Sequence, residues 1–296
     1  MKTPFLFLPG KGRAITDPRE RKEAYGFVRV LLTNDDGIHA PGLMALYQEL
    51  HEDFEVQVVA PEMEMSAVGH AITLSSPLRV RPVNRGGAFF GHAVSGTPAD
   101  CVKIAVQEIL DTPPDVVLSG INLGANVGVN VLYSGTVSAA TEGAFLGIRS
   151  AAISLDTLRE ADYGFAAAFS RELIRYLTAN GLRPGTALNV NIPALDPSRI
   201  AGVAVTRQGV SRFKERFDRR IDPRGGAYYW LTGEIPVEPE NPDTDGAALK
   251  ANRITITPIH YDLTSVEDLE RLRARKLPAF ENLAISPRRH VAKEET

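Results

Sequence analysis

The chain has 296 residues, with 33 Lys or Arg and 36 Asp or Glu, so its formal net charge is −3 when His is neutral. This balance offers neither the basic surface typical of nucleic-acid binding nor an acidic tail. Hydrophobic residues make up 44% of the chain and charged residues 23%, which excludes wholesale disorder and fibrous repeats.

Cysteine content and the pattern of apolar runs predict a cytoplasmic protein without a membrane anchor. The single cysteine, Cys101, excludes an intramolecular disulfide and a zinc site built from several cysteines. The apolar run Phe5–Leu8 stops at Pro9-Gly10, too early for a membrane span or a secretory signal. Residues 1–26 are rich in Pro, Gly and charge, so we expect a flexible N-terminal extension there.

Residues 27–195 alternate short apolar runs with segments of helical periodicity. Strands are expected at Phe27–Leu32, Phe54–Ala60, Phe89–Val94, Asp115–Leu118, Ala151–Leu155 and Ala187–Pro193. Helices are expected from Pro41 and over Pro98–Leu110, Val137–Leu146 and Tyr163–Leu177. This order implies right-handed crossovers and a doubly wound α/β fold with a mostly parallel sheet, which forms the catalytic core.

Residues 196–296 follow a looser pattern. Strand-like pieces at Gly202–Thr206, Tyr228–Leu231 and Ile254–Ile259 are separated by loops rich in Pro, Gly and Asp. This pattern favours an antiparallel C-terminal extension with an arm for oligomerisation. A surface hairpin without a partner is the alternative.

Oxygen-bearing side chains follow several of the expected strands. Asp35 and Asp36 come after the first strand, Ser66 lies in the loop after the second, and Asn122 follows the strand at 115–118. Ligands of open α/β sheets bind at the carboxyl edge of the strands, where these side chains can converge. Two adjacent carboxylates repel each other unless a cation is present, and an all-oxygen ligand set favours Mg²⁺ or Mn²⁺. The alternative is a plain turn at Asn34–Gly37.

A second group of residues is suited to phosphate. The segment Ser119–Gly128, which includes Asn126, is rich in glycine, so a ligand can approach its backbone closely. Ser134, Gly135 and Thr136 lead into a helix, whose first N–H groups and positive dipole end attract phosphate. Alternatively, Ser134 or Thr136 merely caps that helix, and capping is compatible with phosphate binding.

Other polar residues have simpler structural interpretations. Thr97 and Asp100 flank Pro98 as helix-capping residues, and Cys101 is expected to be a buried, inert thiol. His39 and His70 have no ligand spacing, although both flank the proposed site.

These segments together resemble a known family, the SurE (survival protein E) nucleotidases, which are metal-dependent phosphatases of nucleoside monophosphates. The matching blocks are Leu32–Gly37 with Ala40–Gly42, Val59–Pro61 with Ser66, Ser95–Val102, Ser119–Gly124, Tyr133–Val137 and Leu188–Pro193. They occur in the family's order from about Phe27 to Pro193. The chain departs from the family at Glu62–Met65, where many relatives carry basic residues, and in its N-terminal extension.

The resemblance implies a Rossmann-like core and hydrolysis of nucleoside 5′-monophosphates and 3′-nucleotides, in some members with activity on short polyphosphate. It also implies a homodimer or homotetramer that exchanges the C-terminal region, with neither a nucleic-acid polymer nor a membrane as partner. One divalent ion, Mg²⁺ or Mn²⁺, is expected on Asp35, Asp36, Ser66 and Asn122, and substrate on Asn126, Ser134, Gly135 and Thr136.

For the reaction, we expect Asp35 to orient the attacking water as well as to bind the ion, with direct attack by Asp35 as the alternative. Two other classes of function remain open. A metal-dependent nucleotidyl or glycosyl transferase would require an acceptor substrate, and a non-catalytic nucleotide-binding assembly protein would bind nucleotide without turnover.

Overall fold

The computed structural model describes residues 27–159, 161–210, 214–234 and 241–275, and the extension expected over residues 1–26 lies outside them. The chain divides into two compact units, one ending at Tyr261 and one beginning at Asp262. The described part of the second unit contains the helix α7 (Val266–Arg273), which Ser265 caps. Within the described ranges, no helix has the length and apolar character that a membrane crossing requires.

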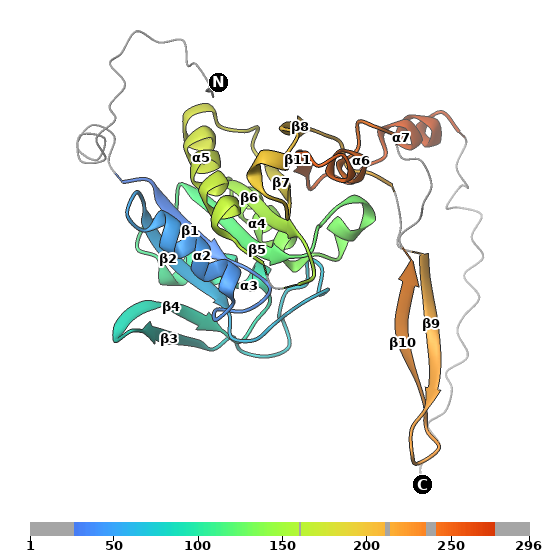
Figure 1. Ribbon diagram of the computed structural model, residues 1–296, viewed down its shortest axis with the longest axis horizontal. Helices are drawn as coiled ribbons and strands as arrows, with labels where there is room; N and C mark the ends of the chain where they lie inside the picture. Colours follow the sequence, from blue (N-terminus) through green and yellow to red (C-terminus); the bar gives the residue numbers. More distant parts are fainter. Residues whose placement is uncertain (1–26, 160, 211–213, 235–240, 276–296) are drawn as a thin grey trace, which may run out of the picture. The chain divides into compact units, whose positions relative to one another are not determined.

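A nine-stranded sheet forms the centre of the first unit (Figure 1). Its strands are, in spatial order, β3 (Val80–Arg85), β4 (Ala88–Val94), β2 (Glu55–Pro61), β1 (Arg29–Thr33), β5 (Val116–Leu123), β6 (Arg149–Asp156), β7 (Thr186–Pro193), β11 (Ile254–His260) and β8 (Val203–Val205). Its helices are α2 (Pro41–Leu50), α3 (Pro98–Ile104), α4 (Gly135–Phe145), α5 (Gly164–Asn180) and α6 (Asp245–Lys250). Short helical turns occur at Ala105–Ile109, Gly128–Leu132 and Pro197–Arg199.

The pairing confirms the expected α/β class with a mostly parallel sheet. β1 pairs in parallel with both β2 and β5, and β5, β6 and β7 continue in parallel. Antiparallel pairing occurs between β3 and β4 and between β7 and β11. The strand order changes direction at β1, where β2 and β5 lie on opposite sides, and such a switch point is where open α/β sheets bind ligands.

Alternate residues of β1 face opposite helical layers. Val30 and Leu32 pack in the same cluster as the buried leucines of α2 and α5, whereas Leu31 packs with Cys101 of α3 and Ala139 of α4. All of these side chains are buried, and a buried leucine typically stabilises a fold by about 2–5 kcal/mol relative to alanine. This packing holds the end of β1, and the residues that follow it, in a fixed place.

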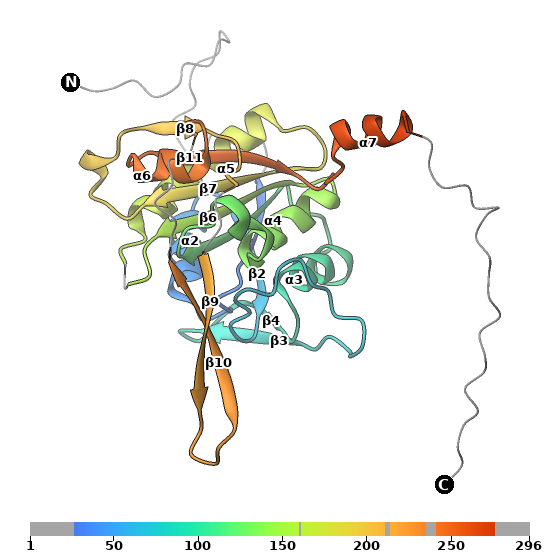
Figure 2. The ribbon, with the colours of Figure 1, turned by 90° about the vertical axis from the view of Figure 1, so that its right-hand side faces the viewer.

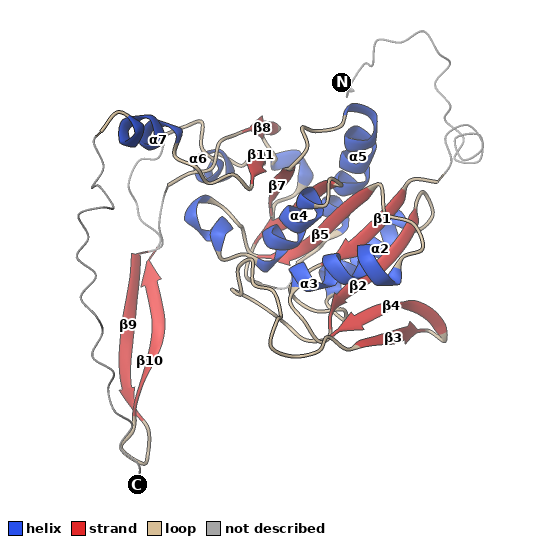
Figure 3. Ribbon diagram, turned by 180° about the vertical axis from the view of Figure 1, so that it is seen from behind, coloured by secondary structure: helices blue, strands red, loops and turns tan. Residues whose placement is uncertain are grey.

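Three features differ from the sequence-based expectations. β5 continues to Leu123, so Asn122 lies within the strand instead of in a loop after it. β3 was not expected and forms an antiparallel edge hairpin with β4 (Figure 3). β8 pairs in parallel with β11, which was not expected, whereas the β7–β11 and β9–β10 pairs are antiparallel, as expected for the C-terminal extension. Because β8 and β11 join the main sheet, that sheet includes strands from both sides of residue 195.

The remaining strands, β9 (Lys214–Ile221) and β10 (Ala227–Glu234), form a separate two-stranded antiparallel sheet. Figure 2 shows them as a twisted ribbon. Opposite residues of such a ribbon share a face, so Phe217 and Leu231 lie on one face, and Asp218 and Trp230 on the other.

Candidate metal and phosphate site

The chain leaves β1 at Thr33 and places the side chain of Asp35 against the N-terminus of α4. Thr136 Oγ1 donates a hydrogen bond to Asp35 Oδ1, and the backbone N–H groups of Gly135 and Thr136 also donate to this carboxylate. The first turn of a helix has unpaired N–H groups and the positive end of the dipole, so a carboxylate is stabilised there. Asp35, which is only 4% exposed, is therefore oriented by the protein itself.

Glycine at position 135 permits this close approach. A Cβ atom there would lie 2.7 Å from Asp35 Cβ, which is closer than packed carbon atoms come, and 3.1 Å from Pro98 Cγ, which is also tight. Burial raises the pKa of Asp35 above its ordinary value, and this effect exceeds the opposing hydrogen bonds from Thr136 and the backbone. A nearby cation would reverse that balance.

Asp36 lies in a less favourable environment than its neighbour. Burial raises the pKa of Asp36 to about 7, and the negative charges of Asp35 and Glu64 contribute to the shift. The charge of Asp36 also adds to the effect of burial in raising the pKa of Tyr163. The site thus concentrates negative charge that a divalent cation would neutralise.

The loop after β2 brings Ser66 to the same region. The backbone N–H of Met65 donates a hydrogen bond of 2.7 Å to the carbonyl oxygen of Asp35, which ties the loop to the acidic pair. Ser66 is exposed, and its Oγ donates to Glu64 Oε1 over 2.6 Å. The lone pairs of this hydroxyl remain available as acceptors for a cation.

Asn122 has a side chain with a defined orientation. Its Nδ2 donates a 2.7 Å hydrogen bond to the carbonyl oxygen of Gly124. The amide nitrogen is thereby committed, so its oxygen is the end suited to a cation. Next to Asp35, the buried Oδ1 of Asn34 has no hydrogen-bond partner, although its Nδ2 donates to Gly37.

The donor set fits a hard divalent ion. Within the described ranges, no group of three or more His, Cys, Asp and Glu side chains could hold a metal. The predicted set instead combines two carboxylates with a hydroxyl and an amide, and its ligands are all oxygen. This chemistry suits Mg²⁺ or Mn²⁺ better than zinc. A bound cation would lower the raised pKa values of both Asp35 and Asp36.

Asn126 is held on several sides in the glycine-rich segment. Its backbone N–H donates to Asn191 Oδ1, and its carbonyl oxygen accepts from Asn189 and Asn191 of β7. Its Nδ2 donates to Ser154 Oγ. Sequence reasoning missed this network, because residues of β6 and β7 approach the segment only in the folded sheet. Whether Asn126 contacts substrate stays a prediction.

The segment before α4 has the capping role that was the alternative interpretation. Ser134 Oγ accepts a 3.1 Å hydrogen bond from the backbone N–H of Val137. Thr136 is fully buried, and its hydroxyl donates to Asp35. The Thr97 and Asp100 capping box is also confirmed, and Cys101 is a buried free cysteine, with burial raising the pKa of its thiol.

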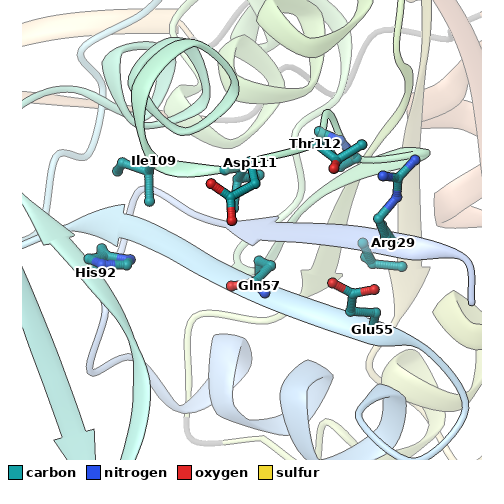
Figure 4. Close-up of a pocket in the computed structure, with 10 residues that line it drawn as sticks. Arg29, Glu55, Gln57, His92, Ile109, Asp111 and Thr112 are labelled. Carbon is teal, nitrogen blue, oxygen red and sulfur yellow. The ribbon is translucent and has the colours of Figure 1, made fainter.

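A cavity of about 420 Å³ lies away from these residues (Figure 4). Arg29 and Glu55, which begin β1 and β2, line it, whereas Asp35 follows the carboxyl end of β1. Figure 4 shows Gln57 on β2 opposite Asp111. No residue predicted to bind ion or substrate lines this cavity.

Comparison with known proteins gives a consistent result. The family model described as survival protein SurE matches residues 30–215. The chain is 57% identical over 245 residues to the 5′-nucleotidase SurE of Syntrophobacter fumaroxidans, which covers 83% of this chain and 98% of that protein. It is 58% identical over 248 residues to the 5′-nucleotidase SurE of Syntrophus aciditrophicus, covering 83% and 93%. Among solved structures, the SurE protein from Aquifex aeolicus matches with a TM-score of 0.72 and 38% identity, covering 83% of this chain and 99% of that one.

Proposed function

The chain belongs to the SurE family, and on that premise we propose that it is a divalent-metal-dependent 5′-nucleotidase that hydrolyses nucleoside 5′-monophosphates to nucleoside and phosphate. The observation that carries the proposal is the buried Asp35, hydrogen-bonded to the N-terminus of α4 beside Asp36, at the sheet's switch point. The position, burial and charge of this pair are typical of a site that binds a cation and a phosphate together.

Four side chains would hold the ion: Asp35, Asp36, Ser66 and Asn122. When bound, a divalent ion polarises a phosphoryl oxygen and lowers the pKa of a coordinated water. Asp36 supplies charge without a hydrogen bond from α4, whereas Asp35 is held by Thr136 and by the helix backbone.

Asp35 has the geometry to orient the attacking water. Donors on α4 fix its carboxylate, and each carboxylate oxygen has two lone pairs, so acceptor capacity remains for a proton of that water. Ser134, Gly135 and Asn126 then contact the phosphate, favoured by the positive end of the α4 dipole. Thr136 contributes to substrate binding by holding Asp35 in place.

Assembly and location extend the proposal. The exposed hairpin of β9 and β10 joins copies of the chain into a homodimer or homotetramer. The free, buried Cys101 fits a reducing cytoplasm. The substrate is a small nucleotide, consistent with a net charge of −3 and with no basic surface for a nucleic-acid polymer.

Phosphate release tests the function directly. AMP, GMP, 3′-AMP and tripolyphosphate are incubated with the full chain in Mn²⁺, in Mg²⁺ and in EDTA. We expect release from 5′-monophosphates in water alone, abolished by EDTA. Asp35→Asn should lower kcat by roughly 10²-fold or more, because it removes the acceptor for the water proton. Asp111→Asn, in the cavity at the other end of β1, is the matched control.

Other outcomes of this assay would indicate a different function or a different catalytic residue. A requirement for a second, acceptor substrate would indicate a transferase. Nucleotide binding without turnover at any metal concentration would indicate a binding or assembly protein. Near-normal turnover by a folded Asp35→Asn variant would remove Asp35 from the mechanism.

A further inference from the structure

A buried carboxylate on α4 holds the loop that carries Ser66. His70 Nε2 donates to Glu142 Oε2 over 2.9 Å, and Lys103 Nζ donates to Glu142 Oε1 over 2.6 Å. The side chain of Glu142 is only 3% exposed, whereas those of His70 and Lys103 are partly exposed. The site described above uses none of them.

Burying this carboxylate is unfavourable unless partners compensate. Burial raises the pKa of Glu142, but the hydrogen bonds and charges of His70 and Lys103 together lower it by more. The pKa of Glu142 therefore lies below its ordinary value. The His70 ring also stacks on Phe145, with ring centres 5.0 Å apart. His70 is therefore fixed to α4 by both a hydrogen bond and a ring contact.

The position of Glu142 on α4 connects two parts of the proposed site. Glu142 lies about two helical turns after Gly135 and Thr136, which hold Asp35 at the start of the same helix. His70 follows Ser66 closely in the loop. The same helix thus holds Asp35 at its first turn and the loop that carries Ser66 further along.

Other contacts leave a short free stretch around Ser66. Met65 is bonded to Asp35 before it, and Gly69 donates to the carbonyl oxygen of Tyr133 after it. Thr73 donates to Asp100, which caps α3. Ser66 itself is exposed, and its side chain contacts only Glu64 among the hydrogen bonds above. The position of Ser66 thus depends on these flanking attachments.

Resting on the proposed function, we propose that His70 is a positioning residue for the metal site. By binding Glu142, His70 holds the loop so that Ser66 completes the oxygen ligands begun by Asp35 and Asp36. His70 does not touch the ion or the substrate. Lys103 keeps Glu142 paired, so removing His70 loosens the loop without leaving a buried carboxylate alone.

The test compares His70→Ala with His70→Gln in the full-length protein. Glutamine places an N–H donor at nearly the reach of histidine Nε2, so it can keep the bond to Glu142. We expect His70→Ala to weaken Mn²⁺ binding, measured by calorimetry, by about 10-fold, the lower end of the loss seen when outer-shell partners are removed. His70→Gln should restore most of that affinity. His51→Ala, on α2, is the matched control.

Hydrogen exchange in the metal-free protein gives a readout independent of catalysis. We expect faster exchange of the amides from 66 to 73 in His70→Ala, with exchange in β1 and β5 unchanged. Unchanged Mn²⁺ affinity and loop exchange in His70→Ala would overturn the inference, as would faster exchange across the whole sheet. If wild-type protein binds no Mn²⁺ and releases no phosphate, the proposed function fails, but the exchange result still decides whether His70 holds the loop.

Discussion

At the scale of single residues, the two neighbouring aspartates have different tasks because their surroundings differ. Asp35 receives hydrogen bonds from Thr136 and from the backbone at the start of α4. Asp36 faces burial and the charges of Asp35 and Glu64, so its pKa rises to about 7. The pKa values of both carboxyl groups are raised, but only Asp35 has hydrogen bonds that oppose the shift. The repulsion at Asp36 is what a bound cation would relieve.

This difference predicts an unusual response to Asp36→Asn. The pKa of Asp36 is raised in the folded state, so between its unfolded value of 3.8 and about 7 the folded state keeps a proton that the unfolded state has lost. The group's contribution to stability therefore falls as pH rises toward 7, and stays low above it. In EDTA, Asp36→Asn should have a higher Tm than wild type, by more at pH 8 than at pH 5.

A bound metal ion should reverse the order of the Tm values of wild type and Asp36→Asn. Mn²⁺ should raise the Tm of the wild type at pH 8 and raise that of Asp36→Asn much less, because the variant lacks one charged ligand. Asp111→Asn serves as control, since Asp111 lines the separate cavity. Equal Tm values in EDTA together with equal Mn²⁺ shifts would show that Asp36 is not part of a cation site.

The sequence predicts the acidic pair but not its partners. Asp35 and Asp36 stand out because they follow a buried apolar strand, and that position is visible in the sequence. The hydrogen bond between Thr136 and Asp35 is not, because it depends on how α4 meets the end of β1. The electrostatic influence of Asp36 on Tyr163, the residue before α5, is missed for the same reason.

At the scale of elements, α4 combines a structural and a functional role at its first turn. Ser134 caps the helix, Gly135 lets Asp35 approach, and Thr136 donates to Asp35. The helix was expected from Val137 and begins at Gly135, because Ser134 supplies the cap. Two strand features that include glycine or proline were missed. β5 continues through Gly120, and edge strand β3 contains Pro82, and both residues are typical of loops.

A substitution at Ser134 tests whether this residue only caps α4 or also supports substrate binding. Ser134→Ala should destabilise the protein by about 1 kcal/mol, the usual loss for an N-cap, as measured by urea unfolding. It should also raise KM for AMP, because the cap orders the first turn of α4, which we propose contacts the phosphate. Ser265→Ala, at the cap of α7, is the control and should leave KM unchanged. Equal KM values in all three proteins would reduce Ser134 to a structural cap.

At the scale of the whole molecule, the hairpin is the part of the described chain least accounted for by the fold itself. Its strands pair only with each other in the sheet topology, and Phe217 and Leu231 are 66% and 56% exposed on one face. This face also carries Arg219, opposite Tyr229, and the other face carries Arg216 and Asp218 beside Trp230. An isolated two-stranded hairpin is marginally stable in water, and an exposed apolar face is typical of an interface. The sequence predicted strand β10 within an arm, but not β9. Charged residues occupy most positions of β9, so its sequence shows no clear alternation of apolar and polar residues.

This asymmetry predicts which substitution should dissociate the oligomer. Leu231→Lys places a charge on the apolar face, and burying an unpaired ammonium in an interface is strongly unfavourable. We expect light scattering to show a dimer or tetramer for the wild type and a monomer for this variant. Thr232→Lys adds the same charge to the opposite face and should leave the assembly intact. Both variants should still bind Mn²⁺, because Asp35, Asp36, Ser66 and Asn122 all lie outside the hairpin. A wild-type monomer, or equal dissociation by both variants, would contradict assembly through this face.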